Sequence, residues 1–210
     1  MKRSILTVLL AGILLLGTAK ASWGYGVFGK TDLTFTPTAK SLATGSLGVA
    51  INWSEGDLGY FNFDYGLLPD LEAGLVILTN PADNTVRFRA KYTILHEDYD
   101  SPALAIGVED LGSDSNLSPY IVLSKSFPKS GFYGNIGVGG GNFNGIFGGL
   151  GVIFPGSSKR SGVRQTELFL EADSYGLNAG AKLGIGSNTR INFSMTNLEQ
   201  WMAGVTFLIN

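Results

Sequence analysis

The sequence predicts an all-β protein, an antiparallel up-and-down transmembrane β-barrel of about twelve strands, on three observations. From Gly45 to the C-terminus, stretches of roughly ten residues alternate apolar and polar side chains and end in short turns. No stretch after residue 21 has the ~18 apolar residues that a membrane helix needs. The chain begins with a pattern typical of export, and strands of ~9–11 residues suit a tilted crossing of a bilayer.

The N-terminus has the pattern of a secretory signal. Lys2 and Arg3 precede an apolar run from Ile5 to Leu16, and Ala19 and Ala21 mark a small-x-small cleavage site. A retained membrane anchor is the alternative, but the run is short for a span. We therefore predict a signal peptide over residues 1–21 and a single barrel domain over 22–210. Because the sequence has no cysteine for lipid attachment or disulfides, we expect the outer membrane of a Gram-negative-type envelope.

Twelve stretches of alternating polarity follow one another after Gly45. They cover residues 46–53, 61–65, 71–77, 85–94, 104–109, 120–127, 132–138, 146–154, 167–173, 177–183, 190–195 and 201–209. Turn residues separate them, as in Asn80-Pro81 and Pro128-Lys129-Ser130. The alternation is blurred from Ile121 to Leu123, whose faces the pattern does not assign. The count lies between ten and fourteen, and the even numbers of bacterial barrels favour twelve over a thirteenth strand at 31–36. Residues 22–44 then form an N-terminal segment beside or inside the barrel.

The stretch from Thr85 to Ile94 shows the two faces of a strand most clearly. Apolar Val86, Phe88 and Tyr92 alternate with polar or charged residues, and a period of two places the two sets on opposite faces. In a membrane barrel the apolar face is turned to lipid. We predict that the following residues face lipid: Val86, Phe88, Tyr92, Phe193, Trp201, Val205 and Phe207.

The opposite faces carry a cluster of charges that we assign to the lumen. It comprises Arg87, Arg89, Lys91, Glu72 and Glu109. The three cations could line a path for an anionic polysaccharide or another anion. The alternative, which we favour, is a buried network of ion pairs with Glu72, Glu109 or Asp64 that fills the lumen and fixes strand register. A narrow polar pore remains an open alternative.

A barrel in water is the main alternative fold, because a soluble lipocalin-like barrel keeps its apolar side chains inside around a lipid or small hydrophobic ligand. Aromatic residues near strand ends, such as Trp53, Tyr65 and Phe154, favour the membrane reading, since they resemble interfacial girdles. The last strand, from Trp201 to Phe207, resembles the terminal signal that barrel-assembly machinery reads, although three residues follow it. The expected partners are therefore outer-membrane lipid and that machinery.

Composition and motifs exclude several other classes of function. The net charge is −2 and becomes more negative without the signal, so no basic stripe is available for nucleic acid. His96 is the only histidine and lies in a polar turn, which makes a zinc site improbable. We select no catalytic residue, metal ligand or cofactor, and expect no enzyme; a lipid-modifying barrel enzyme that uses His96 is a lesser alternative. The glycines at 139–141 and 148–149 lack the context of a phosphate-binding loop.

Three segments resemble the YjbH/GfcD-type exopolysaccharide (group 4 capsule) outer-membrane proteins. Thr36-Pro37-Thr38-Ala39 before Gly45-Ser46-Leu47 looks like the family's early signature. A second family segment is similar to residues 102–107 followed by Asp110-Leu111-Gly112. A third is similar to Tyr120 with Ser124-Lys125-Ser126-Phe127, followed by Gly137-Val138-Gly139. Order and spacing agree over about residues 26–154.

This resemblance implies an outer-membrane β-barrel that takes part in secretion or assembly of an extracellular polysaccharide. The partners it implies are the polysaccharide or proteins of an export complex. Family members are much longer and often lipoproteins, whereas this chain has a single predicted barrel and no cysteine. It therefore resembles a short, single-barrel relative, and the family supplies no catalytic residue to transfer.

Overall fold

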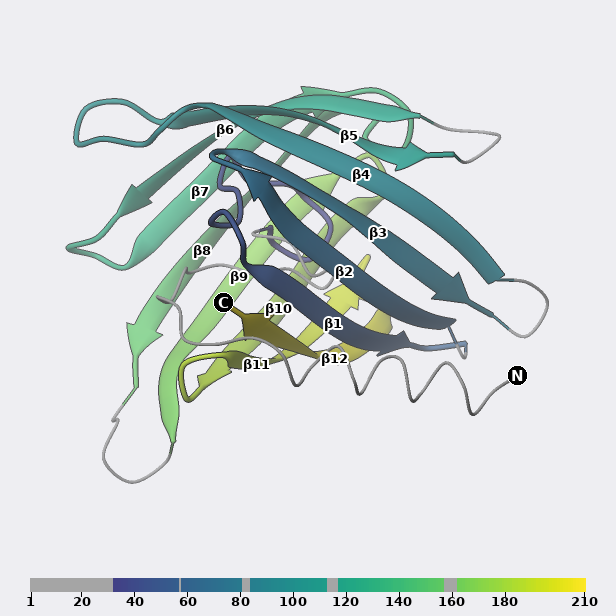
Figure 1. Cartoon of the computed structure of the whole chain (residues 1–210). Helices are drawn as coiled ribbons and strands as arrows, with labels where there is room; N and C mark the ends of the chain where they lie inside the picture. The colour runs from purple at the N-terminus through teal and green to yellow at the C-terminus, as the bar shows by residue number, and fades with distance from the viewer. Residues whose placement is uncertain (1–31, 57, 81–83, 113–116, 157–161) are drawn as a thin grey trace.

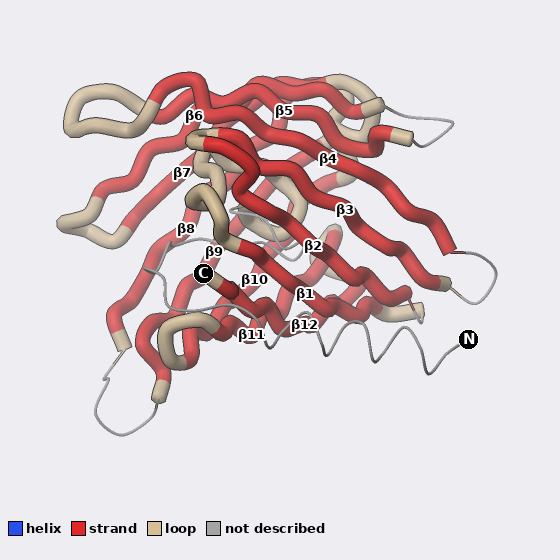
Figure 2. Tube along the Cα trace, viewed as in Figure 1, coloured by secondary structure: helices blue, strands red, loops and turns tan. Residues whose placement is uncertain are grey.

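The described part of the chain forms a closed barrel of antiparallel strands (Figures 1 and 2). The computed structural model describes residues 32–56, 58–80, 84–112, 117–156 and 162–210. Each strand pairs with its neighbour in sequence, and the first strand pairs with the last. The predicted all-β barrel of twelve strands is therefore confirmed. The predicted signal peptide lies outside the described residues, and none of the described residues forms a helix long and apolar enough to span a membrane.

The strands are eight to twelve residues long. Their bounds are β1 (Leu47–Ser54), β2 (Leu58–Leu68), β3 (Leu71–Thr79), β4 (Asn84–Leu95), β5 (Ala103–Leu111), β6 (Ser118–Phe127), β7 (Phe132–Gly139), β8 (Gly145–Pro155), β9 (Val163–Asp173), β10 (Gly176–Ile185), β11 (Thr189–Thr196) and β12 (Gln200–Ile209). Residues 32–36 are not a strand, so a thirteenth does not form there. We call the end of the barrel where β1 begins and β12 ends the terminal end, and the opposite end the far end.

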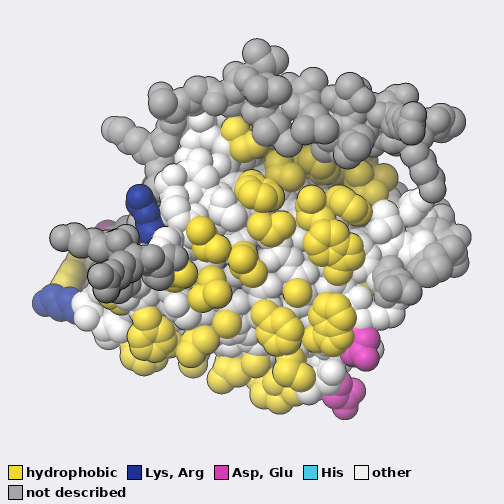
Figure 3. All heavy atoms as spheres, turned by 90° about the horizontal axis from the view of Figure 1, so that it is seen from below, with side chains coloured by type: hydrophobic (Ala, Val, Ile, Leu, Met, Phe, Trp, Pro, Cys, Tyr) yellow, Lys and Arg dark blue, Asp and Glu magenta, His cyan; other side chains and the backbone are white. Residues whose placement is uncertain are grey.

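The outer surface of the barrel is apolar. Alternate residues of each strand point outward, and large hydrophobic side chains such as Phe88, Leu150 and Phe193 are half exposed or more. Figure 3 shows one side of this surface, where hydrophobic side chains spread across the strands and charged ones lie towards the edges. We call this outward surface the apolar belt. In β6, where the sequence pattern assigned no faces, Ile121 and Leu123 belong to the belt and Val122 points inward.

Inward-facing glycines make room for large side chains inside the barrel. A Cβ atom on Gly137 would lie 2.3 Å from Phe147 Cζ, and one on Gly180 would lie 2.3 Å from Phe169 Cζ. In each case the aromatic ring of the neighbouring strand occupies the space that the glycine leaves. A small barrel is filled by such pairs of small and large residues, which explains much of the high glycine content.

The described residues before β1 lie inside the barrel. Residues 32–44, which we call the lumen segment, pass between opposite walls, as the purple trace in Figure 1 shows. Asp32, Leu33, Thr34 and Ala39 are almost completely buried, although the segment has no regular secondary structure. Of the two positions predicted for the N-terminal segment, the described part therefore takes the one inside the barrel.

We expect Gly137→Ala to destabilise the barrel by about 1–3 kcal/mol, because the added methyl group overlaps the Phe147 ring. The measurement is urea unfolding in detergent micelles, followed by tryptophan fluorescence. Gly140→Ala is the matched control, since a Cβ there has its nearest neighbour at 3.8 Å. If both variants unfolded at the same urea concentration, the small-and-large filling of the interior would be wrong; recovery in Gly137→Ala/Phe147→Leu would support it.

Candidate functional site: a charged lumen that holds a segment of its own chain

Arg89 and Asp64 form a buried, two-point ion pair inside the barrel. Arg89 Nε donates to Asp64 Oδ1 at 2.7 Å and Nη2 donates to Oδ2 at 2.5 Å. The two residues lie on β4 and β2, and Gly74 of β3 lies between them in register. A Cβ atom on Gly74 would lie 1.9 Å from Asp64 Oδ1, so only glycine leaves room for this pair to meet across the strand.

The same arrangement of a glycine between two polar residues recurs around the wall. Asn192 Nδ2 donates to Asn52 Oδ1 at 3.0 Å across Gly204 of β12. Because the glycines bring side chains of next-nearest strands into contact, the lumen wall is cross-linked by polar contacts beyond the backbone ladder.

Lys91 joins the wall to the lumen segment. Its ammonium nitrogen lies 3.3 Å from Glu72 Oε1 on the neighbouring strand and 3.0 Å from Asp32 Oδ1 of the segment. All three side chains are almost completely buried. Asp32 Oδ1 also accepts a hydrogen bond from the backbone amide of Thr38 at 2.7 Å, which closes a turn within the segment.

Lys182 of β10 makes the corresponding contact from the opposite side of the barrel. Its ammonium nitrogen lies 3.3 Å from Glu167 Oε1 and donates to the backbone carbonyl of Asp32 at 3.1 Å. The Tyr133 hydroxyl donates to the same Glu167 carboxylate. Lys182 also lies over the face of the Phe169 ring, 4.9 Å from its centre.

Arg87 lies nearer the far end and is less buried than Arg89 or Lys91. Its Nη1 donates to Asp110 Oδ1 at 3.0 Å. The Asp110 carboxylate also accepts hydrogen bonds from Ser118 and Asn142. Glu109, the acidic residue of β5 assigned to the cluster by the sequence, is half-buried and pairs in register with Ser118.

Glu171 of β9 holds the middle of the lumen segment. Its carboxylate accepts hydrogen bonds from the backbone amides of Phe35 and Thr36 and from the Thr36 hydroxyl, at 2.9–3.1 Å. Asn135 of β7 donates to the Pro37 carbonyl at 2.8 Å. Gly149 lies between Asn135 and Glu171 in register, and the Leu33 side chain fills the space above it.

The rest of the segment is held by hydroxyls and by a small apolar cluster. Ser124 Oγ accepts from the Ala39 amide at 2.8 Å, and Thr93 Oγ1 donates to the Ala39 carbonyl at 2.9 Å. Glu72 accepts from the Leu42 amide at 2.8 Å. The Ala39 side chain packs in a cluster contributed by β5, β6, β8 and the β7–β8 turn, whose members are Ala103, Ala105, Tyr120, Val122, Phe143 and Phe147. The segment is thus bound by side chains from strands all around the barrel.

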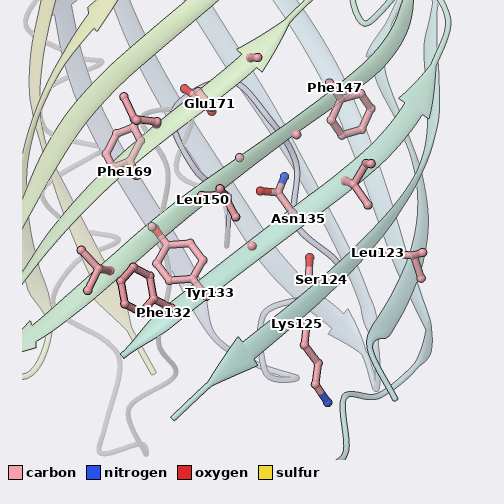
Figure 4. A pocket seen from close by; sticks show the side chains of 18 of the residues that line it. Leu123, Ser124, Lys125, Phe132, Tyr133, Asn135, Phe147, Leu150, Phe169 and Glu171 are labelled. Carbon is pink, nitrogen blue, oxygen red and sulfur yellow. The ribbon is translucent and has the colours of Figure 1, made fainter. Parts of the chain in front are cut away.

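Two hollows lie next to the lumen segment and its wall. One, of about 500 Å³, opens at the terminal end beside residues 39–44 and is lined by Asp70, Thr93, His96 and Glu97. The other, of about 1080 Å³, lies over β6 to β9 (Figure 4) and is lined mainly by outward apolar side chains such as Leu123, Phe132 and Leu150. Its lining is continuous with the apolar belt.

His96 lies outside the lumen, in the loop between β4 and β5. Its side chain is 72% exposed, and Nε2 lies 3.0 Å from Asp70 Oδ1. In the same loop, hydrogen bonds from the backbone amides of Ser101 and Asp100 lower the pKa of the Asp98 carboxyl. Among the described residues, no group of three or more metal-ligating side chains is placed to hold an ion.

The residues that the sequence assigned to lipid lie on the outer surface. Val86, Phe88, Tyr92, Phe193, Trp201 and Phe207 are all more than 40% exposed, and Val205 is half-buried on the same face of β12. The sequence analysis did not select four charged residues that the structure places in the lumen, namely Asp32, Asp110, Glu171 and Lys182. For Glu171 and Lys182 the alternation within β9 and β10 was an available signal; for Asp32, in a segment without periodicity, there was none.

The fold and the lumen define a closed antiparallel barrel of twelve strands that holds a segment of its own chain. The barrel is similar to the solved KdgM porin, with a TM-score of 0.56 and 11% identity over 77% of this chain and 98% of that chain. A structure of KdgM porin in complex with disordered oligogalacturonate gives a TM-score of 0.55 at the same identity and coverage. At this identity the likeness shows the fold. No curated protein matches the chain by sequence.

The chain belongs to the YjbH family, described as "Exopolysaccharide biosynthesis protein YbjH", whose profile matches residues 24–169. The three segments that resemble this family meet inside the barrel. Ala39 of the segment around residues 36–39 packs with Ala103 and Ala105 of the segment that begins at residue 102, and with Tyr120 of the segment that begins there. Ser124, also of this last segment, accepts a hydrogen bond from the Ala39 amide. The family's signature therefore describes the contact between the lumen segment and its wall.

We expect Asp64→Asn to destabilise the barrel by about 3–5 kcal/mol, because it leaves the Arg89 charge buried without its carboxylate. Urea unfolding in micelles measures the loss. Asp64→Asn/Arg89→Met should recover part of it, since no charge is then stranded, and Glu199→Gln in an exposed turn should have little effect. A wild-type unfolding midpoint for Asp64→Asn would contradict a stabilising role for this pair.

Proposed function

We propose that the protein is a non-enzymatic outer-membrane barrel that takes part in exopolysaccharide export or envelope assembly. The observation that carries the proposal is the division of the barrel into an apolar outer belt and a charged, hydrogen-bonded interior. In hydrocarbon, a closed barrel pairs every backbone amide of its strands, and an apolar outer surface is the one that lipid favours.

The soluble alternative, a periplasmic barrel that binds a hydrophobic ligand, is less consistent with this division. Such a barrel needs an apolar cavity and a solvated outer face. Here the interior contains buried Glu72, Lys91, Glu171 and Lys182. The outer surface carries exposed large hydrophobic side chains around the barrel, whereas soluble monomers rarely expose contiguous apolar patches larger than roughly a few hundred Å². The export pattern of residues 1–21 supports the same location.

The link to polysaccharide comes from the family. The chain belongs to a family described by exopolysaccharide biosynthesis, and a barrel in the outer membrane lies where such a polymer must cross. A role in moving or positioning a polymer needs no catalytic group. His96 lies in an exposed loop at the mouth of the barrel, apart from the buried polar groups of the lumen, and this supports the non-enzymatic reading.

The charged cluster of β4 has a structural role in this proposal. Arg89 and Lys91 are each within 3.3 Å of a wall carboxylate, so their charges are compensated within the wall. With the lumen segment in place, we infer a barrel that is closed to large solutes rather than an open anion pore.

We expect the purified protein to require detergent and to migrate faster on gels when unboiled than when boiled. Phe88→Arg, which places a charge on the belt, should destabilise the barrel in lipid vesicles by about 2–4 kcal/mol, while Phe88→Leu should have little effect. The measurement is urea unfolding in vesicles. Solubility without detergent, together with equal stability of both variants, would contradict the membrane location.

We expect deletion of the gene to lower the amount of exopolysaccharide released by cells, measured as uronic acid and hexose in culture supernatants. Plasmid-borne wild-type protein should restore it. His96→Ala should restore it equally, because no reaction depends on the imidazole. Unchanged polysaccharide in the deletion strain would overturn the proposed function, and failure of His96→Ala alone would overturn its non-enzymatic part.

A further inference from the structure

We propose that the wall groups that hold the lumen segment form a binding site for a neutral, hydroxyl-rich glycan, which the segment occupies in the resting state. Glycan and segment then compete for one set of hydrogen-bonding groups. This inference rests on the proposed function and names the ligand class and the site within it.

The wall recognises the segment mostly through the segment's backbone. Glu171 accepts from two amides, Ser124 accepts from one, and Asn135 and Thr93 donate to carbonyls. Figure 4 labels three of these groups, Ser124, Asn135 and Glu171, which lie on β6, β7 and β9 of the wall. Sugar hydroxyls both donate and accept, so a glycan can satisfy the same carboxylate, amide and hydroxyl groups. The wall therefore offers contacts that are not specific to a peptide.

The two wall lysines keep their carboxylate partners without the segment, whereas Glu171 needs donors from the glycan in place of the segment amides. Lys91 keeps its contact with Glu72, and Lys182 keeps its contact with Glu167, which also accepts from Tyr133. Removing one partner of a buried pair is costly because it strands a charge. When the segment leaves, Asp32 leaves with it, and both lysines retain wall carboxylates. The wall can therefore exchange its occupant at a lower cost than if the segment supplied the counter-charges.

The charge balance of the site favours a neutral ligand over a polyanion. The charged residues that contact the described segment from outside it include Glu72, Glu97, Glu171, Lys91 and Lys182, three acidic and two basic. A polyanion would be repelled by the Glu171 carboxylate. It would gain little attraction from Lys91 and Lys182, because both already contact wall carboxylates. A neutral glycan meets no such repulsion.

The site is reachable and is not completely filled. A cavity of about 70 Å³ remains between the segment and the wall, lined by Tyr133, Gln165, Glu167 and Lys182 among others. The hollow of about 500 Å³ at the terminal end reaches the segment at residues 39–44. A glycan entering from this end meets the segment where Thr93 binds it.

A reversible lock tests the competition directly, because the chain has no cysteine of its own. Ala39→Cys/Ala105→Cys places two thiols on side chains that pack in the same buried cluster, and neither side chain is one of the hydrogen-bonding groups of the site. Oxidation fixes the segment in the lumen, and reduction frees it. The two single-cysteine variants are the controls, since they carry the same side-chain changes without a cross-link.

Binding of maltoheptaose, cellohexaose and chitohexaose is measured by titration calorimetry in detergent, with an oligogalacturonate of similar length as the anionic comparison. At least one neutral oligosaccharide should bind the reduced variant at least tenfold more tightly than the oxidised one. A variant from which only residues 32–44 are deleted should bind the same oligosaccharide at least tenfold more tightly than the wild type, because the lumen segment no longer competes for the site. Equal affinity of oxidised and reduced forms, tighter binding of the oligogalacturonate, or binding of none of the neutral probes by the reduced variant would overturn the proposal. The cysteine pair keeps the test valid if the shortened chain does not fold.

The same lock separates this inference from the proposed function in cells. The oxidising periplasm forms the disulfide, so the double-cysteine protein should fail to restore exopolysaccharide in the deletion strain, whereas each single variant restores it. Full restoration by the locked protein would overturn the inference and leave the proposed function standing. Unchanged polysaccharide in the deletion strain itself would overturn the proposed function, whatever the binding measurements show.

Discussion

Inside a closed barrel a charged side chain has only the rest of the lumen as its surroundings, and its partner must come from there. Arg89 finds Asp64 two strands away because Gly74 stands between them, and Lys91 and Lys182 find carboxylates on adjacent strands. These contacts fix which residues lie opposite one another, since a shift of one residue would turn each charge towards the apolar belt. Strand register, the apolar exterior and the position of the lumen segment all depend on this pairing.

The strands were predictable because a period of two is a local property. The stretch from Thr85 to Ile94 carries its own face assignment, and short turns between such stretches leave consecutive strands few arrangements other than antiparallel neighbours. The alternation assigned no faces where both faces of a strand are apolar, as from Ile121 to Leu123. There Val122 points inward to the apolar cluster around Ala39, so burial on the inner face removed the polar signal.

The lumen segment was harder to derive, for a physical reason. Its conformation is set by side chains of distant strands and not by its own periodicity. Asp32 lies 59 residues from Lys91 and 150 residues from Lys182, yet it contacts both. A pattern within residues 32–44 cannot reveal partners that only barrel closure brings near. Likewise, Asp110 lies beside Arg87 because of a positive φ of 60° at a register shift in β5, which simple alternation does not anticipate.

The position of the lumen segment sets an order for assembly. The segment comes before β1 in the chain, but Glu171 of β9 and Lys182 of β10 bind it only once those strands stand opposite β3 and β4. Contacts of such long sequence separation form late, because closing the intervening loop costs conformational entropy before the contact contributes any stabilising free energy. The earliest described residues therefore complete their native contacts late, and a fully docked segment indicates that the strands that bind it, from β3 to β10, have already formed.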